Sequence, residues 1–188
     1  GNVGRMIVKS GSAATSIDND VNVHGRVNLF LVAGGNFNGD FSAGDIGRAI
    51  YRTQDGLTNR LQSATGADTV VIAPSGSQAM SSSATLDVAH SLGRGIFRGN
   101  VKGDIQVGSG QANDGVNLLV ITGDMDAAPN DNTDIDIDGD LSRISIRGDF
   151  TGSGTTTADL KSRSLGSISV GGDVSDADID VGGNTGNM

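Results

Sequence analysis

Three aspartates at alternate positions have the spacing of a metal site. They begin the motif Asp-x-Asp-x-Asp-Gly, which opens a calcium-binding loop whose carboxylate oxygens surround the ion. These residues are Asp134, Asp136 and Asp138. The twelfth position of such a loop is normally a glutamate, but here it is Ser145. The isoleucines between the aspartates indicate a strand, on which the carboxylates lie in a line. We therefore favour a solvated acidic strand, and calcium is the one cofactor that the sequence leaves open.

Residues for nucleophilic and acid–base catalysis are few. The chain has no cysteine, which excludes thiolate nucleophiles and thiolate metal sites. Its two histidines, His24 and His90, lie far apart in the sequence, so a Ser-His-Asp triad is not expected. Aspartates and a basic residue on one sheet face could still act on a polysaccharide, but no cluster interrupts the repeats of the chain as an active site should. We expect that the protein is not an enzyme.

The composition limits which folds the chain can adopt and which partners it can bind. All 22 acidic residues are aspartate, 30 of the 188 residues are glycine, and most of the 13 basic residues are arginine. A chain without glutamate and with few lysines lacks the residues that favour surface helices. The formal net charge of -9 disfavours nucleic-acid binding, which depends on neutralising phosphates. No apolar run is long enough to enter a membrane as a helix.

Eight related octets divide the chain into repeats. Several share the pattern of VGRMIVKS, which runs from Val3 to Ser10. The octets end at Ser10, Gly34, Thr53, Pro74, Gly99, Gly123, Gly148 and Gly172. Successive octets are 19 to 25 residues apart. Most of these steps are near 24 residues, which is about the length of one coil of a three-sided parallel β-solenoid.

Two columns of the aligned octets, the first and the sixth positions, are apolar in every copy. The sixth column contains Val8, Val32, Tyr51, Ile72, Phe97, Ile121, Ile146 and Val170. The fourth position is also mostly apolar, and it shares a strand face with the sixth, so we expect both to point into the core. A second apolar alternation, such as Ile105 and Val107, predicts another strand in most coils.

These patterns predict an all-β fold, a three-sided parallel β-helix of about eight coils of roughly 24 residues. The coil is expected to be right-handed, like other parallel crossovers. A single domain is expected over residues 1–188, with an irregular insertion at 75–85 that forms a serine-rich loop or a short helix. We interpret the chain either as a segment of a longer solenoid or as the subunit of a filament.

The C-terminal repeats resemble a known class of proteins. The segment LGSISVGGDVSDADIDVGGN, from Leu165 to Asn184, is similar to the Gly/Asp-rich repeats of large exported bacterial β-solenoid proteins of adhesin or surface-layer character. The resemblance covers the later coils well and the first three loosely. It implies a solenoid architecture and an extracellular or cell-surface location, and it implies no activity.

The outward positions of the octets form a surface that differs from an ordinary solvated face. Position five is aliphatic in six consecutive copies, which supply Ile7, Leu31, Ile50, Val71, Ile96 and Val120. Positions three and seven on either side carry a cation in every second coil. Their arginines are Arg5, Arg48, Arg52, Arg94, Arg98, Arg143 and Arg147. A stacked aliphatic stripe between cations is typical of a contact surface. The alternation by itself could also space like charges on a solvated face.

These features predict a structural, extracellular protein that forms or contributes to a surface fibre, a surface layer or an adhesin stalk. Stacked coils would make a stiff rod that self-associates end to end or laterally through the aliphatic stripe. One alternative is a module that binds an anionic polysaccharide through the regular cations. Another is a carbohydrate-active enzyme on a β-helix. Neither a nucleic-acid partner nor membrane insertion is expected.

Overall fold

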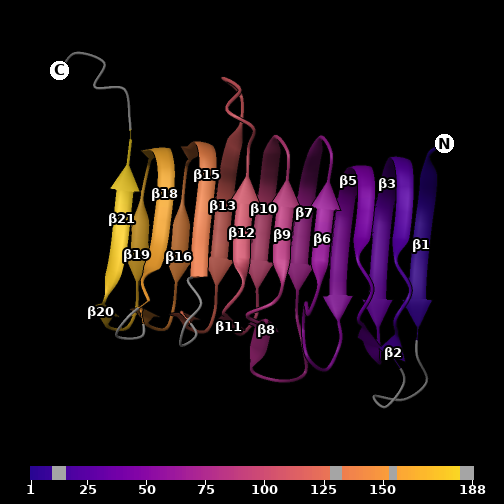
Figure 1. The fold of residues 1–188 in the computed structure, drawn as a ribbon, viewed down its shortest axis with the longest axis horizontal. Helices are drawn as coiled ribbons and strands as arrows, with labels where there is room; N and C mark the ends of the chain where they lie inside the picture. The colour runs from indigo at the N-terminus through magenta and orange to yellow at the C-terminus, as the bar shows by residue number, and fades with distance from the viewer. Residues whose placement is uncertain (10–15, 128–132, 153–155, 183–188) are drawn as a thin grey trace.

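The protein is a parallel β-solenoid in which the coils of the chain lie one on another (Figure 1). The computed structural model describes residues 1–9, 16–127, 133–152 and 156–182. Regular elements in these ranges are strands, and their pairings are parallel. Over the same ranges no helix is long and apolar enough to cross a membrane. The predicted all-β parallel solenoid is therefore confirmed.

The first face of the coil holds the octets. Its strands are β1 (Val3–Lys9), the second halves of β3 (Val21–Ala33) and β5 (Phe41–Arg52), β7 (Gly66–Ile72), β10 (Ser91–Phe97), β13 (Gly115–Ile121), β16 (Ile144–Ile146) and β19 (Ile168–Val170). The pairing register aligns the sixth octet position from Val8 beside Val32 to Ile146 beside Val170. The eight octets thus stack in the register predicted from the sequence, and the sixth position forms one inner file.

The second face precedes the first in each coil. Its strands are the first halves of β3 and β5, β6 (Arg60–Ser63), β9 (Thr85–Val88), β12 (Asp104–Val107), β15 (Thr133–Leu141), β18 (Ala158–Leu165) and β21 (Ala177–Val181). Because β3, β5, β15 and β18 continue around the corner onto the first face, both faces belong to one 14-stranded sheet. This confirms the second strand predicted in most coils.

The third face consists of short strands. They are β2 (Ser16–Ile17), β4 (Asn36–Phe37), β8 (Gln78–Met80), β11 (Asn100–Val101), β14 (Met125–Asp126), β17 (Phe150–Thr151) and β20 (Val174–Ser175). In the segment 75–85, where the sequence predicts an irregular insertion, β8 pairs with β11, and the residues on either side of β8 form bends and turns. Ala79, Met80 and Ala84 in this segment are buried in the core. The surrounding serines obscure this short apolar signal.

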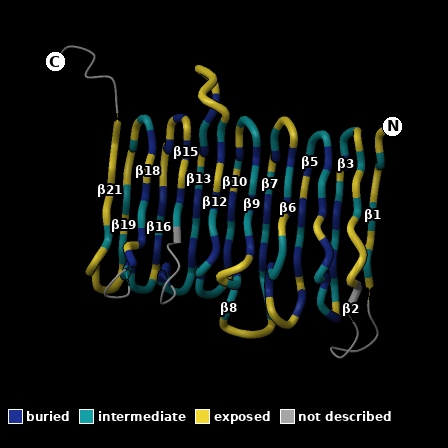
Figure 2. Tube along the Cα trace, in the orientation of Figure 1, coloured by how far each residue is buried: buried dark blue, intermediate teal, exposed yellow. Residues whose placement is uncertain are grey.

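One continuous core fills the space between the three faces. Four of its six aromatic side chains lie in the earlier coils, where Phe30 stacks on Phe41 with ring centroids 3.8 Å apart. Phe37 and Tyr51 meet Phe30 edge-on. Inward side chains are less buried at both ends of the described solenoid, since no described coil covers them there (Figure 2). The core is thus buried by the stacking of one coil on the next and not by a separate layer of helices or sheet.

Short acidic and amide side chains tie successive coils together at the corner between the first and third faces. Asn100 Oδ1 accepts a hydrogen bond from the backbone N–H of Asp124 at 3.1 Å. Asp124 Oδ1 accepts one from Asp149 at 3.0 Å, and Asp149 Oδ1 accepts one from Asp173 at 2.8 Å. We call this series the corner ladder. In each case the residue that precedes the donating N–H group is a glycine. A Cβ atom on that residue would occupy the place of the accepting side-chain oxygen. The three glycines are Gly123, Gly148 and Gly172.

The corner that leads into the second face has similar contacts. Asp20 Oδ1 accepts a hydrogen bond from the N–H of Asp40 at 2.9 Å, and Asp40 Oδ1 accepts one from Arg60 at 3.0 Å. Further along, Asp104 Oδ1 accepts one from Asp134 at 3.3 Å. A short carboxylate of this kind readily bonds to nearby backbone. This gives a physical reason for a chain that uses aspartate and no glutamate.

Candidate functional site

The outward positions three, five and seven of the first face carry cations and no carboxylate. The register places Arg5 beside Leu29, and it places Thr69 between Arg48 and Arg94. The cations therefore recur on every second coil, as the sequence predicts. Neighbouring strands in a sheet lie about 4.8 Å apart, so cations of one column are roughly 9.6 Å apart. At about one Debye length, their mutual repulsion is moderate at physiological salt.

Eight cations of the first face have no carboxylate partner among the described residues. They are Arg5, Lys9, Arg48, Arg52, Arg94, Arg98, Arg143 and Arg147, and all of them are exposed. The other five of the 13 basic residues each contact an aspartate, as Lys102 Nζ contacts Asp126 Oδ2 at 3.4 Å. Positive charge is thus concentrated on one face of a chain whose formal net charge is -9.

Six aliphatic side chains form one column between these cations, which we call the aliphatic column. In stacking order it runs through Ile7, Leu31, Ile50, Val71, Ile96 and Val120. Ile7 is 41% exposed, and the others are half-buried. Ser145 and Ser169 continue the column on the last two coils. The structure therefore joins the predicted contact residues into one surface, while their role as an interface stays a prediction.

Two shallow depressions lie beside the cations of the first face. One, of about 450 Å³, lies between Arg143 and Arg147 and has Leu118 and Val120 in its lining. The other, of about 520 Å³, has Arg52 and Arg98 in its lining at the corner with the third face. Both offer guanidinium groups next to apolar surface, so each suits an acidic group carried on a partly apolar partner.

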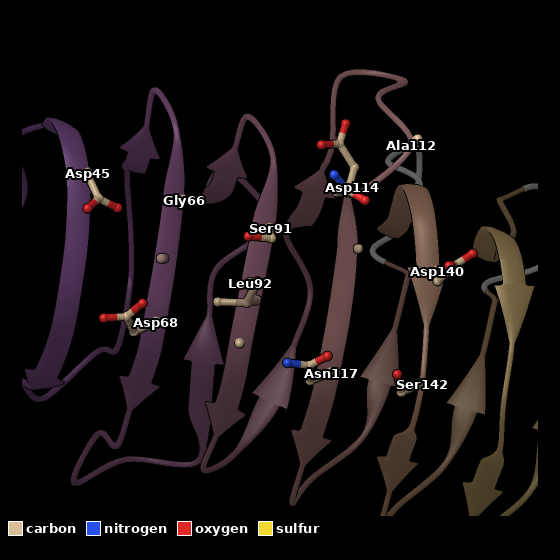
Figure 3. A pocket seen from close by; sticks show the side chains of 14 residues that line it. Asp45, Gly66, Asp68, Ser91, Leu92, Ala112, Asp114, Asn117, Asp140 and Ser142 are labelled. Carbon is tan, nitrogen blue, oxygen red and sulfur yellow. The ribbon is translucent and has the colours of Figure 1, made fainter.

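A second candidate site is a polar groove at the corner between the second and first faces (Figure 3). It has a volume of about 590 Å³ and crosses the coils of β5, β7, β10, β13 and β15. Its acidic lining residues are Asp45, Asp68, Asp114 and Asp140. Sequence reasoning missed this groove, because its four aspartates do not recur at one position of the repeat. No repeated motif marks it.

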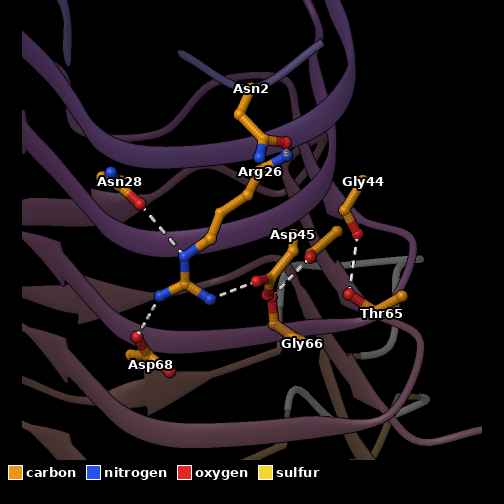
Figure 4. A network of polar contacts seen from close by, with 9 residues as sticks. Asn2, Arg26, Asn28, Gly44, Asp45, Thr65, Gly66 and Asp68 are labelled. Carbon is orange, nitrogen blue, oxygen red and sulfur yellow. Dashed lines mark hydrogen bonds and ion pairs between the residues drawn. The ribbon is translucent and has the colours of Figure 1, made fainter. Parts of the chain in front are cut away.

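Two of these carboxylates are held by one arginine (Figure 4). Arg26 Nη2 donates to Asp68 Oδ2 at 2.7 Å, and its Nη1 donates to Asp45 Oδ2. Its Nε donates to Asn28 Oδ1 at 3.1 Å. Arg26 lies on β3, while Asp45 and Asp68 lie on β5 and β7, so the guanidinium group links three successive coils. At this end of the groove the two carboxylates therefore hold successive coils together through Arg26.

The other two carboxylates are held in the ionised form. The side chain of Asp114 is 2% exposed. It accepts hydrogen bonds from the N–H groups of Ser109 at 2.7 Å and Gln111 at 2.8 Å. These bonds, above all that from Ser109, lower the pKa of Asp114. Arg163, followed by Ser164, lowers the pKa of Asp140. A general acid at a glycosidic bond needs a raised pKa, so both carboxyls are poorly suited to that role.

Ser109, His90 and Asp114 meet in an arrangement that superficially resembles a catalytic triad. His90 Nδ1 lies 3.0 Å from Asp114 Oδ1, and Ser109 Oγ lies 3.2 Å from the same Nδ1 atom. A Ser-His-Asp relay needs the serine and the aspartate on opposite ring nitrogens. Here these contacts fasten the exposed loop between β12 and β13 to the body of the solenoid (Figure 2).

The three residues considered for calcium lie along β15 without converging. Asp136 and Asp138 are exposed, and Asp134 is half-buried with its N–H bonded to Asp104. Within the described ranges, no group of three or more metal-ligating side chains is close enough to hold an ion. Calcium binding stays a prediction, which a comparison of melting temperatures with and without a chelator tests.

Comparison of the chain with protein-family models, with curated proteins and with solved structures finds no match. Its class, a parallel β-solenoid, is defined by its own strand pairing and core.

Proposed function

We propose that the protein is a structural rod that contributes to an extracellular or cell-surface assembly, such as a fibre, a surface layer or an adhesin stalk. The observation that carries the proposal is the first face, where the aliphatic column lies between cations that have no carboxylate partner in the described chain. Half-buried aliphatic side chains flanked by arginines favour contact with another surface. Lateral contact through this face would join rods into a larger structure.

The architecture supports a mechanical role for the rod. Backbone hydrogen bonds connect successive coils through the 14-stranded sheet of the first two faces, and two smaller sheets of five and two strands connect coils on the third face. Corner contacts such as that between Asp124 and Asp149 add further bonds in the same direction. Solenoids of this kind are stabilised by the interfaces between neighbouring repeats, so their stiffness extends over the whole stack.

Electron microscopy of the purified protein, together with variants of the aliphatic column, tests this function. We expect wild-type rods to align side by side, and we expect Ile50→Asp with Ile96→Asp to abolish alignment. Both positions face outward, so the circular dichroism spectrum should keep its β-sheet form. The matched control is Ser82→Asp, at an exposed position between β8 and β9 that lies on neither the first nor the second face, and it should leave alignment intact. Rods that never associate, or alignment that survives the double substitution, would refute lateral assembly.

The unpaired cations favour one second candidate, a module that binds an anionic polysaccharide. Eight exposed cations on one face would neutralise the carboxylates of a polyuronate chain. Retention of the protein on an immobilised uronic-acid polymer, measured at increasing salt, tests this candidate. Arg48→Ser, Arg94→Ser and Arg143→Ser combined should remove the salt-sensitive retention. Wild-type protein that passes through the matrix at low salt would exclude this candidate.

A further inference from the structure

From β9 to β21, the central outward column of the second face carries a carboxylate on every second coil. In stacking order the pairing register aligns Asp87, Gln106, Asp136, Lys161 and Asp180. Aspartates thus alternate with residues that have no negative charge. Successive aspartates are two coils, or about 9.6 Å, apart. We call this series the acidic column.

The acidic column has the same period as the cations of the first face. At octet position three the register aligns Arg48, Thr69, Arg94, Leu118 and Arg143. Both series belong to the same solenoid, so the rise from coil to coil is identical on the two faces. A second rod laid along the first face with its axis aligned would therefore keep the carboxylates of its acidic column in phase with the arginines over the coils that the column spans.

Two aspartates of the acidic column are available to pair with cations of another molecule. Asp136 and Asp180 are exposed, and neither forms an ion pair with another described residue. Lys161 lies between them, and its Nζ is 3.6 Å from Asp159 Oδ2, so an aspartate outside the column already faces this cation. An open depression of about 240 Å³ has both free aspartates in its lining. Asp87, at the other end of the column, is already paired with Arg60.

We propose that the first face of one copy docks on the second face of another copy of this chain, with Arg94 and Arg143 facing Asp136 and Asp180. The proposal rests on the lateral function proposed above and names its partner. The contact joins two different surfaces, so it does not close on itself and adds rods side by side. A slip by one coil brings Lys161 opposite an arginine. Like charges disfavour that register, so the stable registers are two coils apart.

An anionic polysaccharide would also neutralise the first face, but its charge spacing follows its own sugar repeat. A second copy has the required spacing by construction and engages both charged faces at once. Acidic residues of the second copy can also approach the guanidinium groups beside the apolar depression at Val120. The second copy is therefore the occupant that the observations favour.

Sedimentation velocity of two charge-reversed variants tests the docking. The first-face variant carries Arg94→Asp and Arg143→Asp, and the second-face variant carries Asp136→Lys and Asp180→Lys. At low ionic strength we expect wild type to form assemblies that dissociate at high salt. Each variant alone should associate at least about tenfold more weakly, since it sets like charges against each other. An equimolar mixture of the two variants should recover assembly, because each supplies the charge that the other has lost.

A third variant tests the two-coil period without a change in composition or net charge. Gln106→Asp combined with Asp136→Gln moves one carboxylate by a single coil, and it should weaken assembly at low ionic strength. Unchanged melting temperatures would show that all three variants fold. The milder Arg94→Gln and Asp136→Asn replace any reversed variant that does not fold.

The outcomes separate this docking from the function on which it rests. Assembly of the second-face variant at wild-type strength, or a mixture that fails to recover, would overturn the docking. If the Ile50→Asp and Ile96→Asp protein is then still deficient in assembly, lateral association itself survives. A wild-type protein that stays monomeric at every ionic strength refutes both proposals. Its retention on a uronic-acid matrix would then support the polysaccharide in place of the second copy.

Discussion

Gly148 has no side chain because the carboxylate of Asp124 in the preceding coil occupies the place where its Cβ would lie. Gly148→Ala would force the corner ladder apart, and we expect it to lower the free energy of unfolding by about 1–3 kcal/mol. Gly4→Ala is the control, since a Cβ there meets no atom within 4 Å. Urea denaturation of both variants measures the difference. Equal stabilities would contradict the steric role of the corner ladder.

Asp134 provides a prediction on pH dependence. Its Oδ1 and that of Asp159 in the next coil are buried without hydrogen-bond partners. Burial, followed by the charge of Asp159, raises the pKa of Asp134. As the pH rises, Asp134 therefore loses its proton at a lower pH in the unfolded chain than in the folded protein. The carboxyl group thus lowers the stability of the fold once the pH exceeds its pKa in the unfolded chain, which is near 4.

Asp134→Asn should therefore stabilise the protein at neutral pH by about 1 kcal/mol, because the amide can donate to Asp159 and removes a repelling charge. The gain should disappear below about pH 3, where Asp134 is protonated in both the folded and the unfolded chain. Thermal melts of both proteins from acid to neutral pH measure the difference. A gain that is constant with pH, or a loss at neutral pH, would contradict this account.

The hydroxyl of Tyr51 is buried in the aromatic cluster without a hydrogen-bond partner. A buried, unsatisfied polar group costs about 1–3 kcal/mol, so Tyr51→Phe should raise the stability of the protein by roughly 1 kcal/mol. The ring and its edge-on contact with Phe30 remain. Chemical denaturation provides the measurement. A destabilised variant would mean that an internal water satisfies the hydroxyl.

Asp114 should control the loop between β12 and β13. Asp114→Asn weakens the acceptor for the N–H groups of Ser109 and Gln111, and we expect roughly tenfold faster hydrogen exchange at these amides. The pKa of Asp114 is lower in the folded protein than in the unfolded chain. Its carboxylate therefore contributes fully to stability above its pKa in the unfolded chain, and this contribution is lost as the pH falls through its pKa in the folded protein. Asp136→Asn, at an exposed residue without an ion pair in the described chain, is the control and should leave the loop unchanged. Unaltered exchange in both variants would show that the loop is fastened elsewhere.

The octets made the first face predictable, because two independent patterns agree there. Alternation of apolar residues identifies a strand, and recurrence at a nearly constant distance identifies its neighbour. Val8 and Val170 could therefore be assigned to one inner file from the sequence. The aliphatic column and the cation columns followed from the same register, since the intervening positions must face outward.

The short strands of the third face and the groove escaped prediction for different physical reasons. A strand of two or three residues, such as β8, is too short to show any alternation. The groove depends on singular contacts, such as Arg26 with Asp68, that occur in one place and not in every coil. The bond between Asp124 and Asp149 becomes visible only when adjacent coils are placed in register.

The parallel strands run around the axis of the rod, so the bonds between coils run along it. Tension applied to the two ends of the chain therefore loads one coil at a time, beginning at the ends where inward residues such as Val174 are 54% exposed. Each coil of roughly 24 residues that detaches releases about 80 Å of extended chain. Under a steady pull the molecule should lengthen in a series of similar steps, so that a rod anchored at one end would absorb sudden force without losing the rest of its fold.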